Sequence, residues 1–111
     1  LDVLVQVNVS GEASKSGVSP GEAPRLLEAV LSCRRLEVRG LMTVPPYREN
    51  AEESRPYSAA LRELRDELAR RAARPLPELS MGMSHDFAVA VEEGATEIRV
   101  GTALFGARGA P

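Results

Sequence analysis

Residues 79–106 read LSMGMSHDFAVAVEEGATEIRVGTALFG and contain two short strand patterns, each followed by a glycine-containing turn and a helical segment. A short apolar strand at 79–81 runs through a glycine-containing turn into a helix that ends at Gly94. A second strand at 96–100 then enters another glycine-containing turn and a short helical turn at 102–105. Strand, turn and helix twice in succession predict parallel strands that are joined by crossover helices.

Two further strands are predicted before this stretch. Residues 1–8 place Val3, Val5 and Val7 on one face, a period-two pattern that is typical of a strand. Residues 36–44 are also predicted to form a strand. The two prolines that follow end it, because proline lacks the N–H group that a sheet ladder needs. The valine face of the first strand requires cover by a helix.

Two helices are predicted to connect these strands. The first starts within residues 19–22 (SPGE), which offer an N-cap, a proline at the first helical position and a glutamate at the third, and it stops near Cys33. The second runs from about 54 to 73, and charged residues on its outer faces, such as Arg62 and Asp66, are spaced for i,i+4 ion pairs. Its apolar face consists of Tyr57, Leu61, Leu64, Leu68 and Ala72.

The order strand, helix therefore occurs four times, which leaves two α/β architectures open. One is a four-stranded doubly wound sheet, and the other is half of an eight-stranded (β/α) barrel. The chain has 111 residues, whereas a whole barrel needs about 250. If the fold is a barrel, only half of it is present in this chain. Because the chain opens without Met and already inside a strand pattern, we expect it to be a piece of something longer.

Composition narrows the classes of partner and the cellular setting. The chain carries 14 basic and 16 acidic residues, with no cluster of basic residues, so we expect neither nucleic acid nor an anionic membrane as a partner. No apolar run approaches the roughly 18 residues of a membrane span. The single cysteine, Cys33, cannot form an internal disulfide and is expected to be a reduced, buried thiol. The sequence thus predicts a soluble, cytoplasmic protein.

The barrel hypothesis predicts a phosphate site formed by the loops after the last two strands and the start of a short helix. Two turns meet this requirement: one contains Ser84 just before a helix, and the other begins at Gly101. Each offers backbone N–H groups at the positive end of a helix dipole. The alternative is that Ser84 or Asp86 is only an N-cap and that Gly101 only serves a turn.

Arg99 is the candidate cation of this site. In the last strand Ile98 and Val100 share one face, so Arg99 lies on the other, one residue before the second turn. If the aliphatic pair packs under helices, Arg99 points into the barrel and requires an anionic or nitrogenous partner. The alternative is a solvated arginine at the end of a strand.

Other polar residues are weaker candidates. His85 has no partner set for a catalytic triad and is expected to be an exposed first-turn residue. Gln6 and Asn8 share the face of the first strand opposite the valines, where they line the site or make a structural hydrogen bond. Lys15, the single lysine, lies in a polar loop and is expected to be solvated or to order that loop.

Four motifs occur along the chain: VQVNVS at 5–10 with Glu12, Lys15 and Gly17; RGLM at 39–42; LSMGMSHD at 79–86; and IRVGTALFG at 98–106. In these motifs, and in their order and spacing, the chain resembles the pyridoxal phosphate homeostasis proteins of the YggS/PROSC family. That family folds as a single alanine-racemase-like (β/α) barrel, binds pyridoxal phosphate and acts as a carrier or regulator of cofactor and amino-acid pools, without an established catalytic activity.

The resemblance implies a set of cofactor-binding residues. Ser84, Gly101 and Thr102 would hold the cofactor phosphate, Met83 would join them, and Arg99 would face the pyridine nitrogen. An arginine there stays protonated and leaves that nitrogen unprotonated, which weakens the ring as an electron sink. No catalytic residue and no metal are expected. The lysine that the family attaches to the cofactor belongs to the first barrel strand, and Lys15 does not match it.

The resemblance also sets the predicted domain organisation. Residues 1–111 would form the C-terminal half of one pyridoxal phosphate-binding barrel of the alanine racemase N-terminal-domain type, without the N-terminal half. We expect this half to pair with the absent half or with a second copy of itself. Two alternatives stay open: half of a pyridoxal phosphate-dependent amino-acid racemase or decarboxylase, and a half-barrel whose role is assembly alone.

Overall fold

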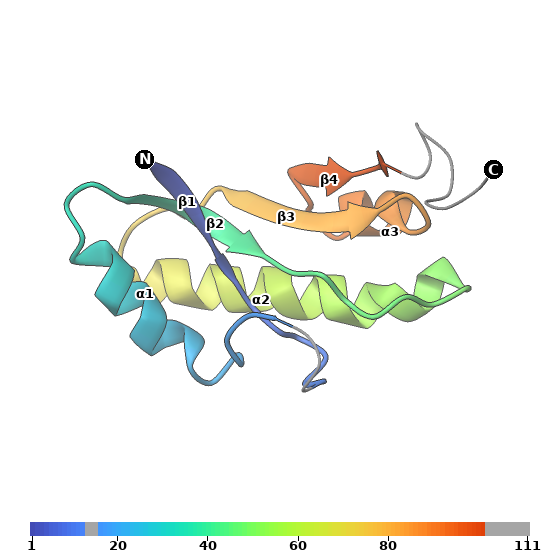
Figure 1. Cartoon of the computed structure of the whole chain (residues 1–111), viewed down its shortest axis with the longest axis horizontal. Coiled ribbons are helices and arrows are strands. Elements are labelled where there is room, and N and C mark those ends of the chain that lie inside the picture. The colour runs from blue at the N-terminus through green and yellow to red at the C-terminus, as the bar shows by residue number, and fades with distance from the viewer. Residues whose placement is uncertain (13–15, 102–111) are drawn as a thin grey trace.

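Four parallel strands lie side by side in the order in which they occur along the chain (Figure 1). The computed structural model describes residues 1–12 and 16–101. The strands are β1 (Asp2–Gln6), β2 (Glu37–Met42), β3 (Glu78–Met83) and β4 (Glu97–Arg99). The helices are α1 (Ala23–Leu31), the 3-10 helix η1 (Ala51–Ser54), α2 (Arg55–Ala72) and α3 (Phe87–Glu92).

The strand order distinguishes the two predicted architectures. A doubly wound sheet reverses its strand order at a switch point, whereas this sheet runs β1-β2-β3-β4 without a reversal. Each helix packs on the two strands that it connects: α1 on β1 and β2, α2 on β2 and β3, α3 on β3 and β4. Right-handed crossovers in sequential order place the helices on one face of the sheet, which is half of a (β/α) barrel.

The hydrophobic core fills the layer between the sheet and the helices. Val5 and Val7 of the first strand region are buried there, as the period-two pattern predicts, and Leu61 and Leu68 of α2 confirm the apolar face of the long helix. The other members of this core are Ala23, Leu27, Val38, Leu41, Leu76, Leu79, Met81 and Ala90. The opposite face of the sheet is more polar at its amino-terminal end, where Asp2, Arg39, Glu78 and Glu97 line a hollow.

The start of α1 differs from the prediction. Ser19 and Glu22 form only half of a capping box. The Glu22 N–H donates to Ser19 Oγ at 3.3 Å, but the Glu22 carboxylate accepts from the Ser19 hydroxyl at 2.9 Å in place of the Ser19 N–H. The helix itself begins only at Ala23. Pro24 has no N–H to donate, so the hydrogen-bond ladder is interrupted between the capping turn and the helix.

Two side-chain predictions are wrong. Cys33 is exposed, because it follows the end of α1 in an exposed stretch, 32–35, that leads to β2. Arg62 pairs with Glu93 at the end of α3, and Asp66 accepts from Arg65 at 2.7 Å, in place of the expected i,i+4 pair. The predicted turn at 102–105 and the Lys15 loop lie outside the described residues.

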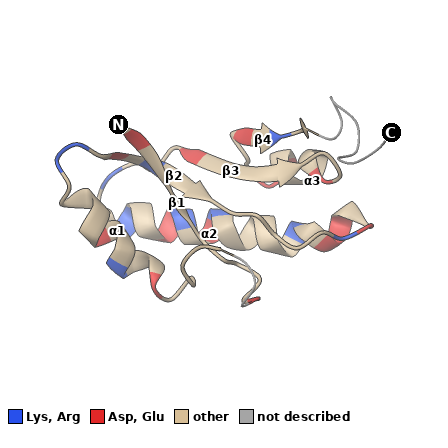
Figure 2. Cartoon of the chain, viewed as in Figure 1, with Lys and Arg blue, Asp and Glu red and all other residues tan. Residues whose placement is uncertain are grey.

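Basic and acidic residues both occur along α2 and in the loops (Figure 2). This mixture agrees with the expectation that clustered positive charge is lacking, within residues 1–12 and 16–101. In the same part of the chain, no helix combines the length and the apolar character that a bilayer crossing demands.

An ion-pair network joins the start of α2 to the end of α3. Arg55 donates to Glu52 at 2.8 Å, to Glu92 at 2.6 Å and to Glu93 at 2.7 Å, and Glu93 also pairs with Arg62. Hydrogen bonds from Arg55 and then Arg62 lower the pKa of Glu93, and the bond from Arg55 lowers that of Glu52. The network thus fixes the segment after β2 against the segment after β3.

We expect this network to make stability depend on acid pH. A carboxylate whose pKa is lowered by folding stabilises the folded state above its unfolded pKa, near 4.5, and that stabilisation is lost as the pH falls through the folded pKa. The melting temperature should therefore drop between pH 6 and pH 3, and Glu93→Gln should lower it at pH 6 and flatten the drop. Glu63→Gln, on the exposed face of α2, is the matched control. Parallel pH profiles for wild type and Glu93→Gln would contradict the argument.

Candidate functional site

A pocket of about 610 Å³ opens where β2, β3 and β4 end. Its lining comes from the last residues of β3 and β4, the β2–α2 segment, the β3–α3 turn and the segment after β4. The carboxyl ends of parallel strands are where barrels and open α/β sheets bind ligands. The lining residues are Val44, Pro45, Tyr47, Met83, Ser84, His85, Arg99 and Gly101.

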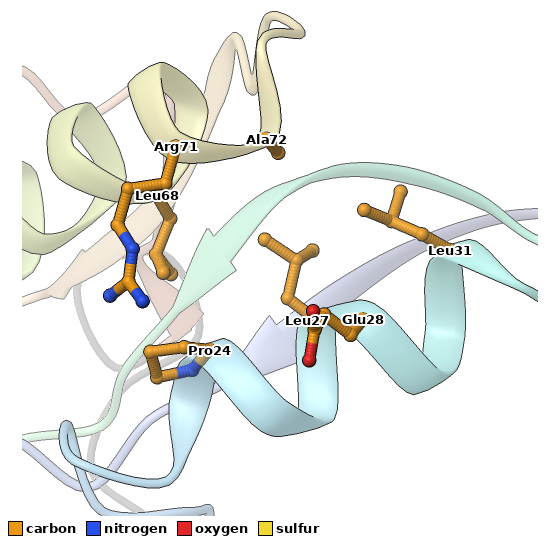
Figure 3. Close-up of a pocket in the computed structure, with 7 residues that line it drawn as sticks. All are labelled: Pro24, Leu27, Glu28, Leu31, Leu68, Arg71 and Ala72. Carbon is orange, nitrogen blue, oxygen red and sulfur yellow. The ribbon is translucent and has the colours of Figure 1, made fainter.

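Two other hollows in the described part of the chain lie elsewhere. One, of about 380 Å³, is a groove on the helix side of the sheet between α1 and α2, where Leu27 and Leu31 face Leu68 and Ala72 (Figure 3). The other, of about 310 Å³, lies at the amino-terminal ends of the strands. Neither contains the residues that the sequence predicts for a site, so the pocket at the carboxyl ends is the candidate site.

The β3–α3 turn brings Met83 and Ser84 to the pocket. Asp86 fixes this turn, since its buried carboxylate accepts from the Met83 N–H at 2.7 Å and its own N–H donates to the Met83 carbonyl at 3.1 Å. Asp86 occupies the N-cap position of α3, but its side chain bonds back to Met83 in place of a capping bond. Gly82 has φ +104°, and a Cβ there would lie 2.8 Å from the Ala90 Cβ, so glycine permits α3 to pack closely on β3.

Arg99 crosses from β4 to the end of β2. Its Nη2 donates to the Thr43 carbonyl at 2.7 Å. Thr43 is itself held by Ser80, whose carbonyl accepts the Thr43 N–H at 3.1 Å, and by Val7, whose carbonyl accepts the Thr43 hydroxyl at 2.7 Å. The guanidinium is therefore anchored on a rigid part of the sheet. This observation supports the prediction that Arg99 faces the inside of the half-barrel.

The electrostatics of Arg99 favour an acceptor in the pocket. Burial lowers the pKa of Arg99, and the nearby carboxylates Glu97 and Asp86 act in the opposite direction. Arginine stays protonated in proteins. Its buried Nε has no hydrogen-bond partner among the described residues, and an unsatisfied buried donor on a charged group is costly. A ligand that presents a nitrogen lone pair or an anionic oxygen would relieve this cost.

His85 is more enclosed than the sequence indicated. Its side chain is only 23% exposed, so the expectation of an exposed first-turn residue is wrong. The imidazole packs on the ring of Tyr47, with centroids 4.5 Å apart and planes tilted by 53°. Its Nε2 lies 3.4 Å from Asp86 Oδ2. This contact encloses His85 between the β2–α2 segment and its own turn.

The structure brings four predicted site residues to one pocket: Met83, Ser84, Arg99 and Gly101. Thr102, the fifth, lies outside the described residues. Asn8 makes structural hydrogen bonds, since its Nδ2 donates to the Glu12 carbonyl at 2.7 Å and its Oδ1 accepts from Ser10 and Gly11.

Thr43 and Tyr47 were missed by sequence reasoning. Thr43 follows the last residue of β2, and Tyr47 follows the Pro45-Pro46 pair, which could have pointed to this segment.

The model of the alanine racemase N-terminal domain family matches residues 1–109. The chain belongs to this family. The match confirms the predicted barrel class, and the resemblance drawn from the four motifs is confirmed by relatives of the same name. The pyridoxal phosphate homeostasis protein of Aquifex aeolicus is 59% identical over 107 residues. That of Pseudomonas aeruginosa is 53% identical over 114 residues.

These matches cover nearly all of this chain but less than half of the relatives. The Aquifex alignment spans 96% of this chain and 47% of that protein, and the Pseudomonas alignment spans 100% and 47%. Among solved structures, PipY of Synechococcus elongatus with pyridoxal phosphate bound superposes with a TM-score of 0.82 at 37% identity. The superposition covers 95% of this chain and 49% of PipY. The chain thus spans about half the length of the relatives that it matches.

Proposed function

We propose that this chain forms the phosphate- and ring-binding half of a pyridoxal phosphate site, in a cytoplasmic protein that holds the cofactor for homeostasis without turning over a substrate. The observation that carries the proposal is the convergence of Met83, Ser84, Arg99 and Gly101 on one pocket. The names of the relatives and the cofactor bound to PipY support it.

The residues of the pocket fit this cofactor. Ser84 and the backbone at Gly101, with Thr102 next to it in the chain, would hold the phosphate, and the unpartnered Nε of Arg99 would meet the ring nitrogen. Bound pyridoxal phosphate supplies an aldehyde that reacts with amines and a ring that accepts electrons. Because Arg99 donates hydrogen bonds and does not give up its proton, it leaves the ring nitrogen unprotonated. Such a site favours holding the cofactor over driving a reaction.

The sheet requires a partner to enclose the site. In the described sheet β1 and β4 are the edges, and parallel strands are seldom left with an uncovered edge or face. We propose that the N-terminal half of a barrel, or a second copy of this chain, completes the wall. Sedimentation that shows a compact monomer at high concentration would contradict this part of the proposal.

Binding of phosphate-bearing ligands tests the proposed function. We expect pyridoxal phosphate and inorganic phosphate to bind the chain, as followed by ³¹P NMR. Ser84→Ala should lower the affinity for both ligands by roughly tenfold or more, the loss expected for one hydrogen bond to a charged group. Ser32→Ala, at the exposed end of α1, is the matched control.

Two results would contradict the proposal. One is equal binding by wild type and Ser84→Ala. The other is racemisation of L-alanine by the chain above the rate with pyridoxal phosphate alone, which would favour the enzyme alternative.

A further inference from the structure

Tyr47 presents an unusually exposed aromatic ring at the candidate site. Pro45 and Pro46, both buried, carry the chain out of β2, and Tyr47 follows them with 64% of its surface exposed. The Tyr47 ring lies outside the hydrophobic core, and its ring contact is with His85, which also lines the pocket. A large aromatic surface is therefore available to a molecule in the pocket.

A chain of contacts positions this ring. The Asp86 carboxylate, 3% exposed, is held by the Met83 N–H. His85 lies against Asp86 through Nε2 at 3.4 Å, and the Tyr47 ring packs on His85. The position of Tyr47 is thus coupled to the turn that carries Met83 and Ser84. A ligand that binds at this turn meets the ring in a defined place.

The pocket lining combines polar and apolar residues. Arg99, Ser84 and Gly101 supply charge, a hydroxyl and backbone, whereas Val44, Pro45 and Met83 supply apolar surface. A small anion such as inorganic phosphate uses only the polar part. A flat ring that carries a phosphate uses both parts, because aromatic faces gain from stacking beyond the burial of area.

We propose that Tyr47, positioned by His85, is a specificity-determining residue that contacts the ring of the bound cofactor and makes the pocket prefer a phosphorylated aromatic ligand over phosphate alone. The inference rests on the proposed function. It assigns the preference to the β2–α2 segment, apart from the phosphate-binding turns and from Arg99.

The test compares pyridoxine 5′-phosphate with inorganic phosphate. The first carries the ring and phosphate but no aldehyde, so it cannot react with amines. We expect Tyr47→Ala to lower the affinity for pyridoxine 5′-phosphate by roughly three- to tenfold, the range of an aromatic contact. The affinity for inorganic phosphate should stay within about twofold of that of wild type. Tyr47→Phe should bind both ligands like wild type. His85→Ala should lower the ratio of the affinity for pyridoxine 5′-phosphate to that for inorganic phosphate, as Tyr47→Ala does. His85→Phe should restore this ratio.

A spectroscopic measurement separates contact from a structural role. The chain has two tyrosines, so Tyr57→Phe leaves Tyr47 as the single source of tyrosine ring signals. Pyridoxine 5′-phosphate should shift these NMR signals, and inorganic phosphate should not. Phe87→Ala, which removes an exposed aromatic ring that does not line the pocket, is the matched control for the affinities.

The outcomes separate this inference from the proposed function. Equal losses for both ligands in Tyr47→Ala, or unshifted ring signals, would overturn the role of Tyr47 while the cofactor site stands. Failure of wild type to bind either ligand would overturn the proposed function and this inference together. A changed ligand ratio with shifted ring signals supports the inference.

Discussion

Gly40→Ala should lower the free energy of unfolding of the chain by about 4 kcal/mol or more. Gly40 lies in β2, where it is paired with Leu4 of β1 and with Glu78 of β3. A Cβ at this position would lie 1.7 Å from the Glu78 carbonyl oxygen and 2.6 Å from its carbonyl carbon. Both are backbone atoms of a paired strand, so no side-chain rotation relieves the overlap.

This loss would remove a large part of the stability of such a domain. Small proteins are stable by about 5–15 kcal/mol, and a buried overlap that separates two strands belongs to the class of substitutions that cost about 4 kcal/mol or more. Circular dichroism during urea and thermal unfolding measures the loss. Gly21→Ala is the control, because Gly21 is exposed and a Cβ there meets nothing within 4 Å. A Gly40→Ala chain with the wild-type unfolding midpoint would disprove the close strand approach.

Sequence reasoning reached the fold because local patterns carry it. The alternation of Val3, Val5 and Val7 predicts a strand with one buried face. The prolines at 45 and 46 limit the second strand, which ends at Met42, two residues before the predicted end at 44, and the apolar face of α2 fixes which side packs on the sheet. These signals lie within a few residues of one another.

The contacts that the sequence did not predict join residues far apart in the chain. Arg99 bonds to Thr43 across 56 positions, and Arg62 pairs with Glu93 across 31. No periodicity reports such pairs, because they depend on how the loops close over the ends of the strands. The same holds for His85, whose short-range pattern indicated exposure but whose packing on Tyr47 depends on a separate loop.

The candidate site could be predicted in part for a related reason. Parallel strands end at one edge, so Ser84 and Gly101, which follow adjacent strands, must lie near each other. Tyr47 follows the strand before them and reaches the same pocket by the same rule. The sequence marked it less clearly, because an aromatic residue after two prolines carries no phosphate-binding signal.

Arg99→Met should lower the affinity for pyridoxine 5′-phosphate by roughly 10- to 100-fold, the loss expected when a hydrogen bond to a charged group is removed. Two effects add. The ligand loses the donor that we assign to its ring nitrogen, and the Thr43 carbonyl loses the bond that ties β4 to the end of β2. Inorganic phosphate lacks the ring nitrogen and should be weakened less. Arg99→Lys should recover little, because an ammonium group does not reproduce the guanidinium fork that serves both partners.

Arg39→Met is the matched control for this variant. Arg39 lies in β2 at the amino-terminal end of the sheet, where it pairs with Glu78 at 3.4 Å, and it does not line the candidate pocket. The control should bind both ligands within about twofold of wild type, since surface pairs contribute little. Isothermal calorimetry on folded samples, verified by circular dichroism, measures the affinities. Wild-type affinity of Arg99→Met for pyridoxine 5′-phosphate would show that the buried guanidinium only holds β4 to β2, and that the ring nitrogen is bound elsewhere.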